Sequence, residues 1–433
     1  MSLELMALIT IGGLVLLVFI GLEVFAAVGI IAAIGLLFFV GQPLGQFPHF
    51  AFTSMDSFVL TAVPLFIFMG AIIANSGIVR SLFAAVNKLV GNFPGGIVTS
   101  VIAVNAVFGA MCGSALAATA TFGKFAYPEM ESLGYNQKLS LGTLAVGGIL
   151  STTIPPSAIL IVYGAWSETS VPRLFAGVLI PGIILALLFM LTIIVKVLLN
   201  PSLVPKPPTS TWGEKLIAIR NLLPWLMVIL IVLGVIFGGV MTPTEAAAMG
   251  GFLSIALALA YRRMSLAVLL ESMWTAVKIT SMIAFLIFTA KVLGQVFIYI
   301  GLVDLFSAYM AGLPFGRYGI IATLALMYLI GGMFIDDWSL LLLSIPFVLP
   351  VITGLGLTRI WFGVWYVMLA GAALITPPFG LNLFVLKSVV PKHDVMTIAL
   401  GALPFLIPML IVVALLTVFP ELALWLPNLL YSR

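Results

Sequence analysis

The sequence predicts an all-α, polytopic membrane protein with an inverted repeat of about ten crossings, two re-entrant helical hairpins and two broken helices. Of its 433 residues, 63% are hydrophobic and 7% are charged, and the mean hydropathy is +1.30. This composition excludes a soluble globular protein. The apolar runs are continuous over roughly 20 residues rather than alternating, which excludes a β-barrel. The single cysteine, Cys112, excludes an internal disulfide, and no Cys/His cluster has metal-binding spacing.

A double proline that occurs twice predicts the position of the binding site. Pro155-Pro156 and Pro377-Pro378 each lie inside an apolar run long enough to span a bilayer. Proline removes a backbone donor and breaks a helix, and a broken helix at membrane depth is tolerated only where it is buried or lines a cavity. Two breaks in corresponding halves indicate the binding site of a secondary transporter.

The first half begins with scaffold spans, which we place at residues 5–41 (two crossings) and 57–78. An amphipathic segment over residues 78–92 is expected to lie at the membrane interface, with an ordinary cytoplasmic loop helix as the alternative. Residues 97–127 predict a re-entrant hairpin with its tip at Gly113-Ser114, because each arm of about 15 residues is short for a span. A tilted pair of full spans is the alternative. The broken helix (139–166) and a closing span (174–199) follow.

The second half follows a linker at residues 200–220 that is rich in Pro, Ser, Thr and Lys. Its elements match those of the first half in kind and order. They are two spans (222–240 and 244–261), a long crossing (266–300), an interfacial segment (301–313), a hairpin with its tip near Asp336-Asp337 (318–351), a broken helix (360–388) and a closing span (395–419).

The two halves align at an offset of 222 residues. This offset places Pro155-Pro156 on Pro377-Pro378, and it also matches Glu23 with Glu245, Pro128 with Pro350 and Gly134 with Gly356. Each half crosses five times in this assignment, and an odd number of crossings inverts one half relative to the other.

Basic residues give an independent test of this topology. Twelve fall on one side of the predicted membrane and only four on the other, which makes the first side cytoplasmic and both termini periplasmic. The twelve are Arg80, Lys88, Lys124, Lys138, Lys196, Lys206, Lys215, Arg220, Arg262, Arg263, Lys387 and Lys392, and the four are Arg173, Arg317, Arg359 and Arg433.

The predicted elements form two groups, each drawn from both halves. The spans and interfacial arms that precede the hairpins are 1–96 and 221–315, and the closing segments are 171–199 and 391–433. The hairpins and broken helices are 97–170 and 316–390, and the cytoplasmic linker is 200–220.

Each half pairs a hairpin tip with a helix break, and such a pair can bind Na⁺. Unwound backbone leaves carbonyl oxygens free, and a nearby hydroxyl or carboxylate completes a shell of hard oxygen ligands. For any single Ser, Thr or Gly, helix packing is the competing explanation. The predicted sodium site 1 consists of Gly113, Ser114, Gly148, Ser151, Thr152, Pro155 and Ser157; sodium site 2 consists of Gly331, Asp336, Gly371, Thr376 and Pro377.

A few polar residues near the breaks could contact an anionic substrate. Asp336 and Asp337 are ionisable residues in a membrane segment, which is by default a functional-site hypothesis; exposure to an aqueous vestibule is the alternative. Asn105, Asp337 and Asn382 are weaker substrate candidates, and helix starts after the breaks would point positive dipole ends at an anion. No phosphate-binding glycine loop is present, so the sequence predicts neither a nucleotide cofactor nor ATP-driven transport, and the scattered basic residues predict no nucleic-acid partner.

Several motifs resemble the large membrane subunit of tripartite ATP-independent periplasmic (TRAP) transporters. They are Gly113-Ser114-Ala115-Leu116-Ala117, Ile154-Pro155-Pro156-Ser157, Thr242-Pro243-Thr244-Glu245-Ala246-Ala247, Phe334-Ile335-Asp336 and Thr376-Pro377-Pro378. The resemblance covers essentially the whole chain. It implies an elevator mechanism, in which the hairpins and broken helices form a mobile transport domain and the remaining spans form a scaffold. It also implies Na⁺ coupling, a small membrane subunit and a soluble periplasmic protein that delivers an organic acid. It also assigns Ser114 and Ser157 to the first Na⁺ site and Asp336 and Thr376 to the second.

The sequence therefore predicts a sodium-coupled importer of a small organic anion in a bacterial inner membrane. Some sialic-acid members of the family carry Ser and Asp where this chain has Cys112 and Ala118, which weakens any transfer of sialic acid as the substrate from those members to this chain. The first alternative is a stand-alone Na⁺- or H⁺-coupled dicarboxylate or citrate carrier without a binding protein. An intramembrane enzyme is disfavoured, because adjacent Asp336 and Asp337 cannot face each other across two helices and both histidines lie in loops.

Overall fold

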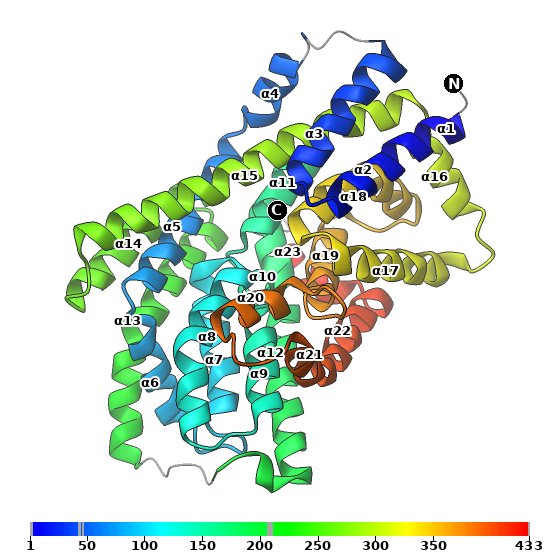
Figure 1. Cartoon of the computed structure of the whole chain (residues 1–433). Helices are drawn as coiled ribbons and strands as arrows, with labels where there is room; N and C mark the ends of the chain where they lie inside the picture. Colours follow the sequence, from blue (N-terminus) through cyan, green and yellow to red (C-terminus); the bar gives the residue numbers. More distant parts are fainter. Residues whose placement is uncertain (1–2, 42–44, 46, 206–210, 432–433) are drawn as a thin grey trace.

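The protein is all-helical in a computed structural model that describes residues 3–41, 45, 47–205 and 211–431 (Figure 1). In these ranges every regular element is a helix. Eight helices there are long and apolar enough to cross a membrane, or nine if the bent pair Gln137–Thr153 and Ala158–Ser167 counts as one span. This confirms the predicted fold class of a polytopic helical membrane protein.

The first half runs from α1 to α12. Its elements before the hairpin are α1 (Leu3–Ala7), η1 (Leu8–Gly12), α2 (Gly13–Phe19), α3 (Val24–Ile34), η2 (Gly35–Val40), α4 (Phe47–Met55), η4 (Phe58–Thr61), α5 (Ala62–Asn75) and the amphipathic α6 (Val79–Val90). The hairpin is α7 (Ile97–Cys112) and α8 (Ala115–Ser132), and the broken helix is α9 (Gln137–Gly147), α10 (Leu150–Thr153) and α11 (Ala158–Ser167). The closing helix is α12 (Val171–Leu199).

The second half follows η5 (Pro201–Leu203). Its elements before the hairpin are α13 (Trp212–Phe237), α14 (Pro243–Ala260), α15 (Leu266–Tyr299) and α16 (Leu302–Ala311). The hairpin is α17 (Gly316–Phe334) and α18 (Asp337–Gly354), and the broken helix is α19 (Arg359–Ala373) and α20 (Leu381–Val389). The chain closes with α21 (Val395–Ala402), η6 (Leu403–Phe405), α22 (Leu406–Val418) and α23 (Glu421–Tyr431).

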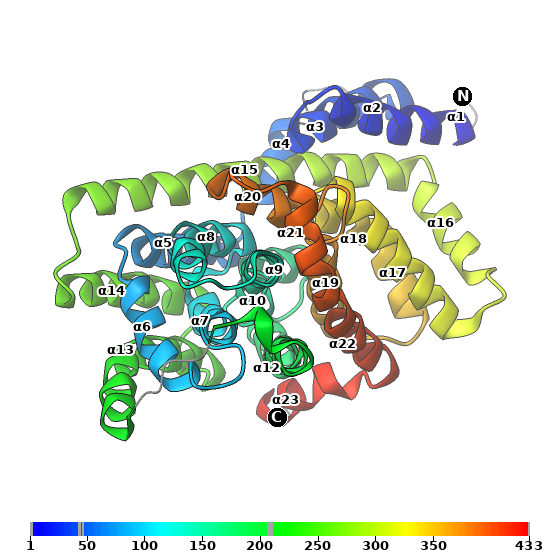
Figure 2. The ribbon, with the colours of Figure 1, turned by 60° about the horizontal axis from the view of Figure 1, so that its bottom comes forward.

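The repeat is visible in the helix boundaries and in the packing. Adding 222 to the bounds of α8 gives 337–354, which are the bounds of α18. The same offset places α3 on α14 and α5 on α15. Helix α5 packs against α14, and α3 packs against α15, so the two halves exchange equivalent contacts. Figure 2 shows α15 as a long helix across the molecule, with α1–α4 on one side and the hairpins and broken helices on the other.

Three features differ in detail from the sequence prediction. Helix α13 begins at Trp212, inside the predicted linker 200–220, because Thr211 and Glu214 form a reciprocal capping box. The hairpin helices are longer than the predicted arms of about 15 residues: α7 has 16 residues and α8 has 18. Helices α17 and α18 are each long and apolar enough to cross a membrane. The re-entrant path and the scaffold and transport boundaries stay predictions, and Lys206 and Arg433 lie outside the described residues.

Candidate functional site

The first helix break is formed by four residues that leave the helical conformation. Helix α10 ends at Thr153, Ile154 is extended, and Ser157 is extended before α11 begins at Ala158. The Pro155-Pro156 peptide bond is cis, as is Pro377-Pro378 in the second half. All residues from 150 to 163 are buried, so the freed backbone groups lie within the protein, as a break at membrane depth requires.

The first hairpin tip packs directly onto this break. Gly113 ends α7 with φ +64°, a conformation that glycine adopts readily, and Ser114 Oγ caps α8 by accepting from the Ala117 N–H at 3.4 Å. A Cβ on Gly113 would lie 3.5 Å from both the Pro156 oxygen and the Ala158 nitrogen. A Cβ on Gly148 would lie 2.6 Å from the Ala115 oxygen. The structure thus brings the two predicted parts of sodium site 1 together.

Three buried hydroxyl oxygens in this region have no hydrogen-bond partner. They are Ser151 Oγ, Ser157 Oγ and Thr119 Oγ1. A buried polar atom without a partner costs free energy, and each such atom calls for an explanation. Thr152 differs, because its hydroxyl donates to the Ile149 carbonyl at 2.9 Å. The unpartnered oxygens of Ser151 and Ser157 belong to the predicted site, and they are of the kind that binds Na⁺.

Sequence reasoning missed Thr119. A Cβ on Gly148 would lie 2.1 Å from Thr119 Oγ1, so this hydroxyl faces the start of the break. Thr119 lies four residues after Ala115, the residue whose carbonyl also approaches Gly148. A helical periodicity count from the tip therefore places both residues on one face of α8.

The second tip and break are more open than the first. Asp336 caps α18, since its carboxylate accepts from the Ser339 N–H at 3.0 Å and from Ser339 Oγ at 2.6 Å. The rings of Phe334 and Phe379 lie 5.4 Å apart and connect the tip to the break. Phe379 is exposed, as is Pro378, and Thr376 and Pro377 are half-buried. The structure brings this tip and break together through aromatic rings.

The other predicted members of sodium site 2 have separate surroundings. The Thr376 hydroxyl donates to the Ala372 carbonyl of its own helix at 2.7 Å. A Cβ on Gly371 would lie 2.5 Å from Ile149 Cγ2, in the first broken helix, and one on Gly331 would lie 3.0 Å from Leu340 Cδ1. No hydrogen bond in the described residues joins Gly331 or Gly371 to Asp336, and sodium site 2 as a whole stays a prediction.

Two of the three substrate candidates converge on the end of α9. The Asn382 amide donates to the Ala145 carbonyl at 3.0 Å, and a Cβ on Gly147 would lie 2.8 Å from the Asn105 amide nitrogen. Both asparagines are fully buried, and the amide oxygens of both lack a partner. Asp337 lies apart from them: it is buried, and its backbone carbonyl accepts from the Tyr366 hydroxyl at 2.6 Å.

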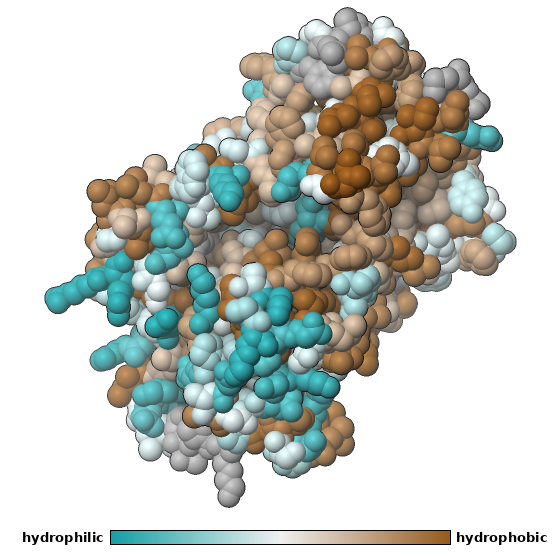
Figure 3. All heavy atoms as spheres, in the orientation of Figure 1, coloured by the Kyte–Doolittle hydropathy of each residue, from teal (hydrophilic) through white to brown (hydrophobic). Residues whose placement is uncertain are grey.

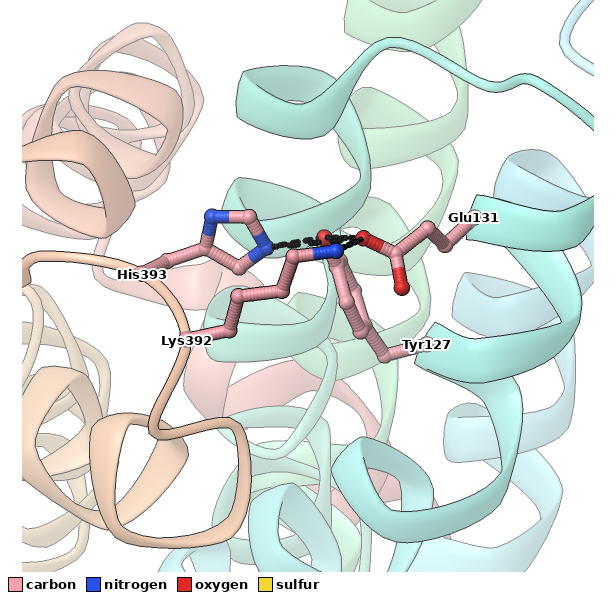
Figure 4. A network of polar contacts seen from close by, with 4 residues as sticks. All are labelled: Tyr127, Glu131, Lys392 and His393. Atoms are coloured by element: carbon pink, nitrogen blue, oxygen red, sulfur yellow. Dashed lines mark hydrogen bonds and ion pairs between the residues drawn. The ribbon is translucent and has the colours of Figure 1, made fainter.

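A polar cluster fixes the far end of the first hairpin. In Figure 4, Tyr127 and Glu131 of α8 point towards Lys392 and His393 in the loop between α20 and α21. The Lys392 ammonium donates to Glu131 at 2.8 Å, and Tyr127 hydrogen-bonds to His393. The bond from Lys392 holds the pKa of the exposed Glu131 carboxyl below its ordinary value. These contacts connect the first hairpin to the second half of the chain.

The sequence matches one protein family over nearly its whole length. Residues 11–422 match the family described as tripartite ATP-independent periplasmic transporter, DctM component. The chain belongs to this family. A TRAP large permease is a multi-pass membrane transport component rather than an enzyme, in agreement with the sequence prediction.

Curated TRAP permeases resemble the chain at about equal levels. The C4-dicarboxylate TRAP transporter large permease DctM of Pseudomonas aeruginosa is 32% identical, over 87% of this chain and 88% of that protein. The sialic acid TRAP transporter large permease SiaM of Vibrio cholerae is 31% identical, over 87% of each. The isethionate TRAP transporter permease DctMQ of Oleidesulfovibrio alaskensis is 29% identical, over 88% of this chain and 60% of that longer protein.

Two solved transporter structures share the fold. The YdaH transporter of Alcanivorax borkumensis gives a TM-score of 0.58 at 15% identity, over 88% of this chain and 86% of that one. MtrF of Neisseria gonorrhoeae gives 0.59 at 12% identity, over 88% and 85%. At these identities the likeness concerns the fold alone.

Proposed function

We propose that this TRAP large permease imports a small organic anion across the bacterial inner membrane by coupling it to Na⁺. The observation that carries the proposal is the packing of the first hairpin tip onto the first helix break, where hydroxyl oxygens of Thr119, Ser151 and Ser157 are buried without partners. Unwound backbone and hydroxyl oxygens are the ligands that Na⁺ uses in secondary transporters. A bound ion would compensate the cost of burying these atoms.

The substrate class follows from the relatives and from the two buried asparagines. Three curated permeases are named for C4-dicarboxylates, sialic acid and isethionate, which are anions at neutral pH, and two are named for ectoine, a zwitterion that carries a carboxylate. Amide groups of Asn105 and Asn382, near the end of α9, can hydrogen-bond a carboxylate or a hydroxyl. Helices α11 and α20 begin just after the breaks, and their positive ends favour an anion nearby. We therefore expect a carboxylate or sugar acid.

The partners of this chain are proposed from the family. A tripartite transporter needs a small membrane subunit and a periplasmic binding protein in addition to the large permease. The DctMQ relative supports the first partner, because this chain spans only 60% of its length.

We further propose an elevator movement. The hairpins α7–α8 and α17–α18 and the broken helices α9–α11 and α19–α20 would form the moving transport domain. The remaining spans would form the scaffold, with α6 and α16 as its interfacial arms. The packing of α20 against α8 and α9 supports a single transport unit built from both halves.

Reconstituted transport tests the proposal. The permease is placed in liposomes with and without the small subunit and the binding protein, and uptake of radiolabelled organic acids is measured under an inward Na⁺ gradient. We expect uptake that requires Na⁺ and both partners and that is lost in Asp336→Ala. Uptake by this chain alone would indicate a stand-alone carrier. Uptake driven by protons without Na⁺ would contradict the ion assignment.

A further inference from the structure

A basic cavity lies away from the helix breaks, where α5, α6 and the turn between α14 and α15 meet. Its volume is about 440 Å³, and its lining includes Ser76, Arg80, Ser81, Tyr261 and Arg263. A neighbouring cavity of about 200 Å³ shares Arg80 and is lined on its other side by Lys124 of α8. Scaffold and hairpin elements thus contribute three cations to adjoining spaces.

These cations have no acidic counterpart in the part of the chain that the structure describes. Neither cavity is lined by an Asp or Glu, and none of the ion pairs there involves Arg80, Lys124 or Arg263. The Arg80 guanidinium lies 5.9 Å from the centre of the Phe125 ring, which orients it without neutralising it. Clustered positive charges repel one another, so an anion bound between them would be stabilised.

The surroundings indicate an anion that belongs to the membrane. Helix α6 buries Val79, Leu82 and Phe83 on one face and carries Arg80 on the other, as a helix lying in the interface does. Leu259 and Leu266, on either side of the α14–α15 turn, are exposed apolar residues suited to lipid chains. In Figure 3 hydrophilic side chains gather over α6, α8 and this turn, next to hydrophobic surface. The charge distribution places this end of the molecule at the cytoplasmic leaflet.

We propose that this cavity binds the phosphate headgroup of an anionic phospholipid of the cytoplasmic leaflet. The guanidinium groups of Arg80 and Arg263 would hold the phosphate oxygens, and the Tyr261 hydroxyl, whose present bond to the Asn221 carbonyl is long at 3.5 Å, can turn to donate to them. Basic pockets at this level of a membrane protein are recognised lipid sites. The inference does not depend on sodium coupling.

A bridging headgroup would affect movement between the two parts. Arg80 and Arg263 lie on scaffold elements, and Lys124 lies on the first hairpin. A lipid phosphate beside Arg80 would therefore lie between the scaffold and the transport domain, which move relative to each other in the proposed elevator mechanism. Anionic lipid would therefore stabilise the arrangement described here.

Lipid titration tests the site on the full chain, purified with any co-purifying membrane partner. The complex is delipidated and titrated with phosphatidylglycerol, phosphatidylcholine or inorganic phosphate, and bound lipid is counted by native mass spectrometry alongside the melting temperature. We expect phosphatidylglycerol to bind and stabilise and the other two not to. Stabilisation by inorganic phosphate to the same extent would overturn the lipid assignment in favour of a soluble anion.

Charge-removing variants locate the binding. Arg80→Gln and Arg263→Gln should each weaken phosphatidylglycerol binding about fivefold, the typical contribution of one basic residue at an anionic surface. Arg220→Gln is the matched control: Arg220 is exposed on α13, has the same predicted sidedness and lines neither cavity. Arg80 also contacts the Phe125 ring, so Arg80→Gln removes a packing contact as well as a charge. Arg263→Gln removes a charge and leaves that contact in place. Equal effects of all three variants, or none, would overturn the site.

Discussion

At the scale of single residues, the candidate sodium site is characterised by hydroxyl oxygens that are buried without a hydrogen-bond partner. Most serines and threonines in these helices donate to the carbonyl one turn earlier, as Thr121 does to Ala117 and Thr376 to Ala372. Thr119, Ser151 and Ser157 do not, and all three lie where the first tip meets the first break; Ser140 and Thr143 of α9 are also buried without a partner. The candidate ion site is therefore marked by three such oxygens lying beside unwound backbone, and not by the lack of a partner alone.

Thr119→Val separates the ion-site explanation from a packing role. Valine keeps the shape and removes the hydroxyl, so we expect the Na⁺ concentration for half-maximal uptake to rise about tenfold or more, the typical loss for one bond to a charged partner. Stability without Na⁺ should be unchanged or higher, because an unpartnered buried polar atom is removed. Thr353→Val is the control, since Thr353 is exposed and donates to the Leu349 carbonyl. A fall in stability with unchanged Na⁺ dependence would assign Thr119 a structural role.

At the scale of elements, close contact between hairpin and broken helix determines the shape of the site. Gly148→Ala should push the tip away from the break, because the added Cβ would lie 2.1 Å from Thr119 Oγ1 and 2.6 Å from the Ala115 carbonyl. We expect a loss of about 1–3 kcal/mol, as for other overpacked sites, and a lower melting temperature in a thermal assay. Gly234→Ala is the control, since nothing lies within 4 Å of its added Cβ. Equal stability of Gly148→Ala and wild type would show that the contact is looser than described.

The polar cluster at the far end of α8 should make the attachment of this hairpin sensitive to pH. The pKa of Glu131 is held below its ordinary value by Lys392, so the folded state binds this proton less readily than the unfolded state. The contact therefore contributes stability above the unfolded pKa of about 4.3, and this contribution is lost as the pH falls through the folded value.

Glu131→Gln measures this contribution. The variant should melt below the wild type at neutral pH, and the difference should shrink as the pH falls below about 4.3 and vanish once the pH has passed through the lowered folded pKa of Glu131. Glu271→Gln, at an exposed position on α15 with no ion pair among the described residues, should show no such difference. A gap between Glu131→Gln and wild type that persists in acid would mean that the cluster acts through packing rather than charge.

At the scale of the whole molecule, the sequence predicted the features that local chemistry determines. Proline pairs at 155–156 and 377–378 interrupt helices because proline lacks an N–H, and the structure confirms both breaks. The interruptions at Gly113-Ser114 and near Asp336-Asp337 were also predicted, because polar residues there divide apolar runs, and in the structure Ser114 and Asp336 cap the helices that follow. The offset of 222 residues anticipated the matching bounds of α8 and α18.

Features set by tertiary contact could not be predicted in this way. Thr119 becomes significant only because Gly148 packs against it, and no local pattern indicates which helix will cross α8 there. The asparagines 105 and 382 are far apart in the chain, and only the folded structure brings both to the end of α9. The start of α13 was missed because the capping residues Thr211 and Glu214 lie in a stretch whose overall composition is that of a linker.

The most direct test of the central claim is substrate-dependent uptake of radioactive sodium into proteoliposomes that contain the complete transporter. We expect Na⁺ to enter with the organic anion in a fixed ratio. We also expect Thr119→Val to lower this coupled flux at subsaturating Na⁺ and Thr353→Val to leave it unchanged. Organic-anion uptake without accompanying Na⁺ would contradict sodium coupling, and coupled flux that is identical in wild type and Thr119→Val would contradict the location of the site.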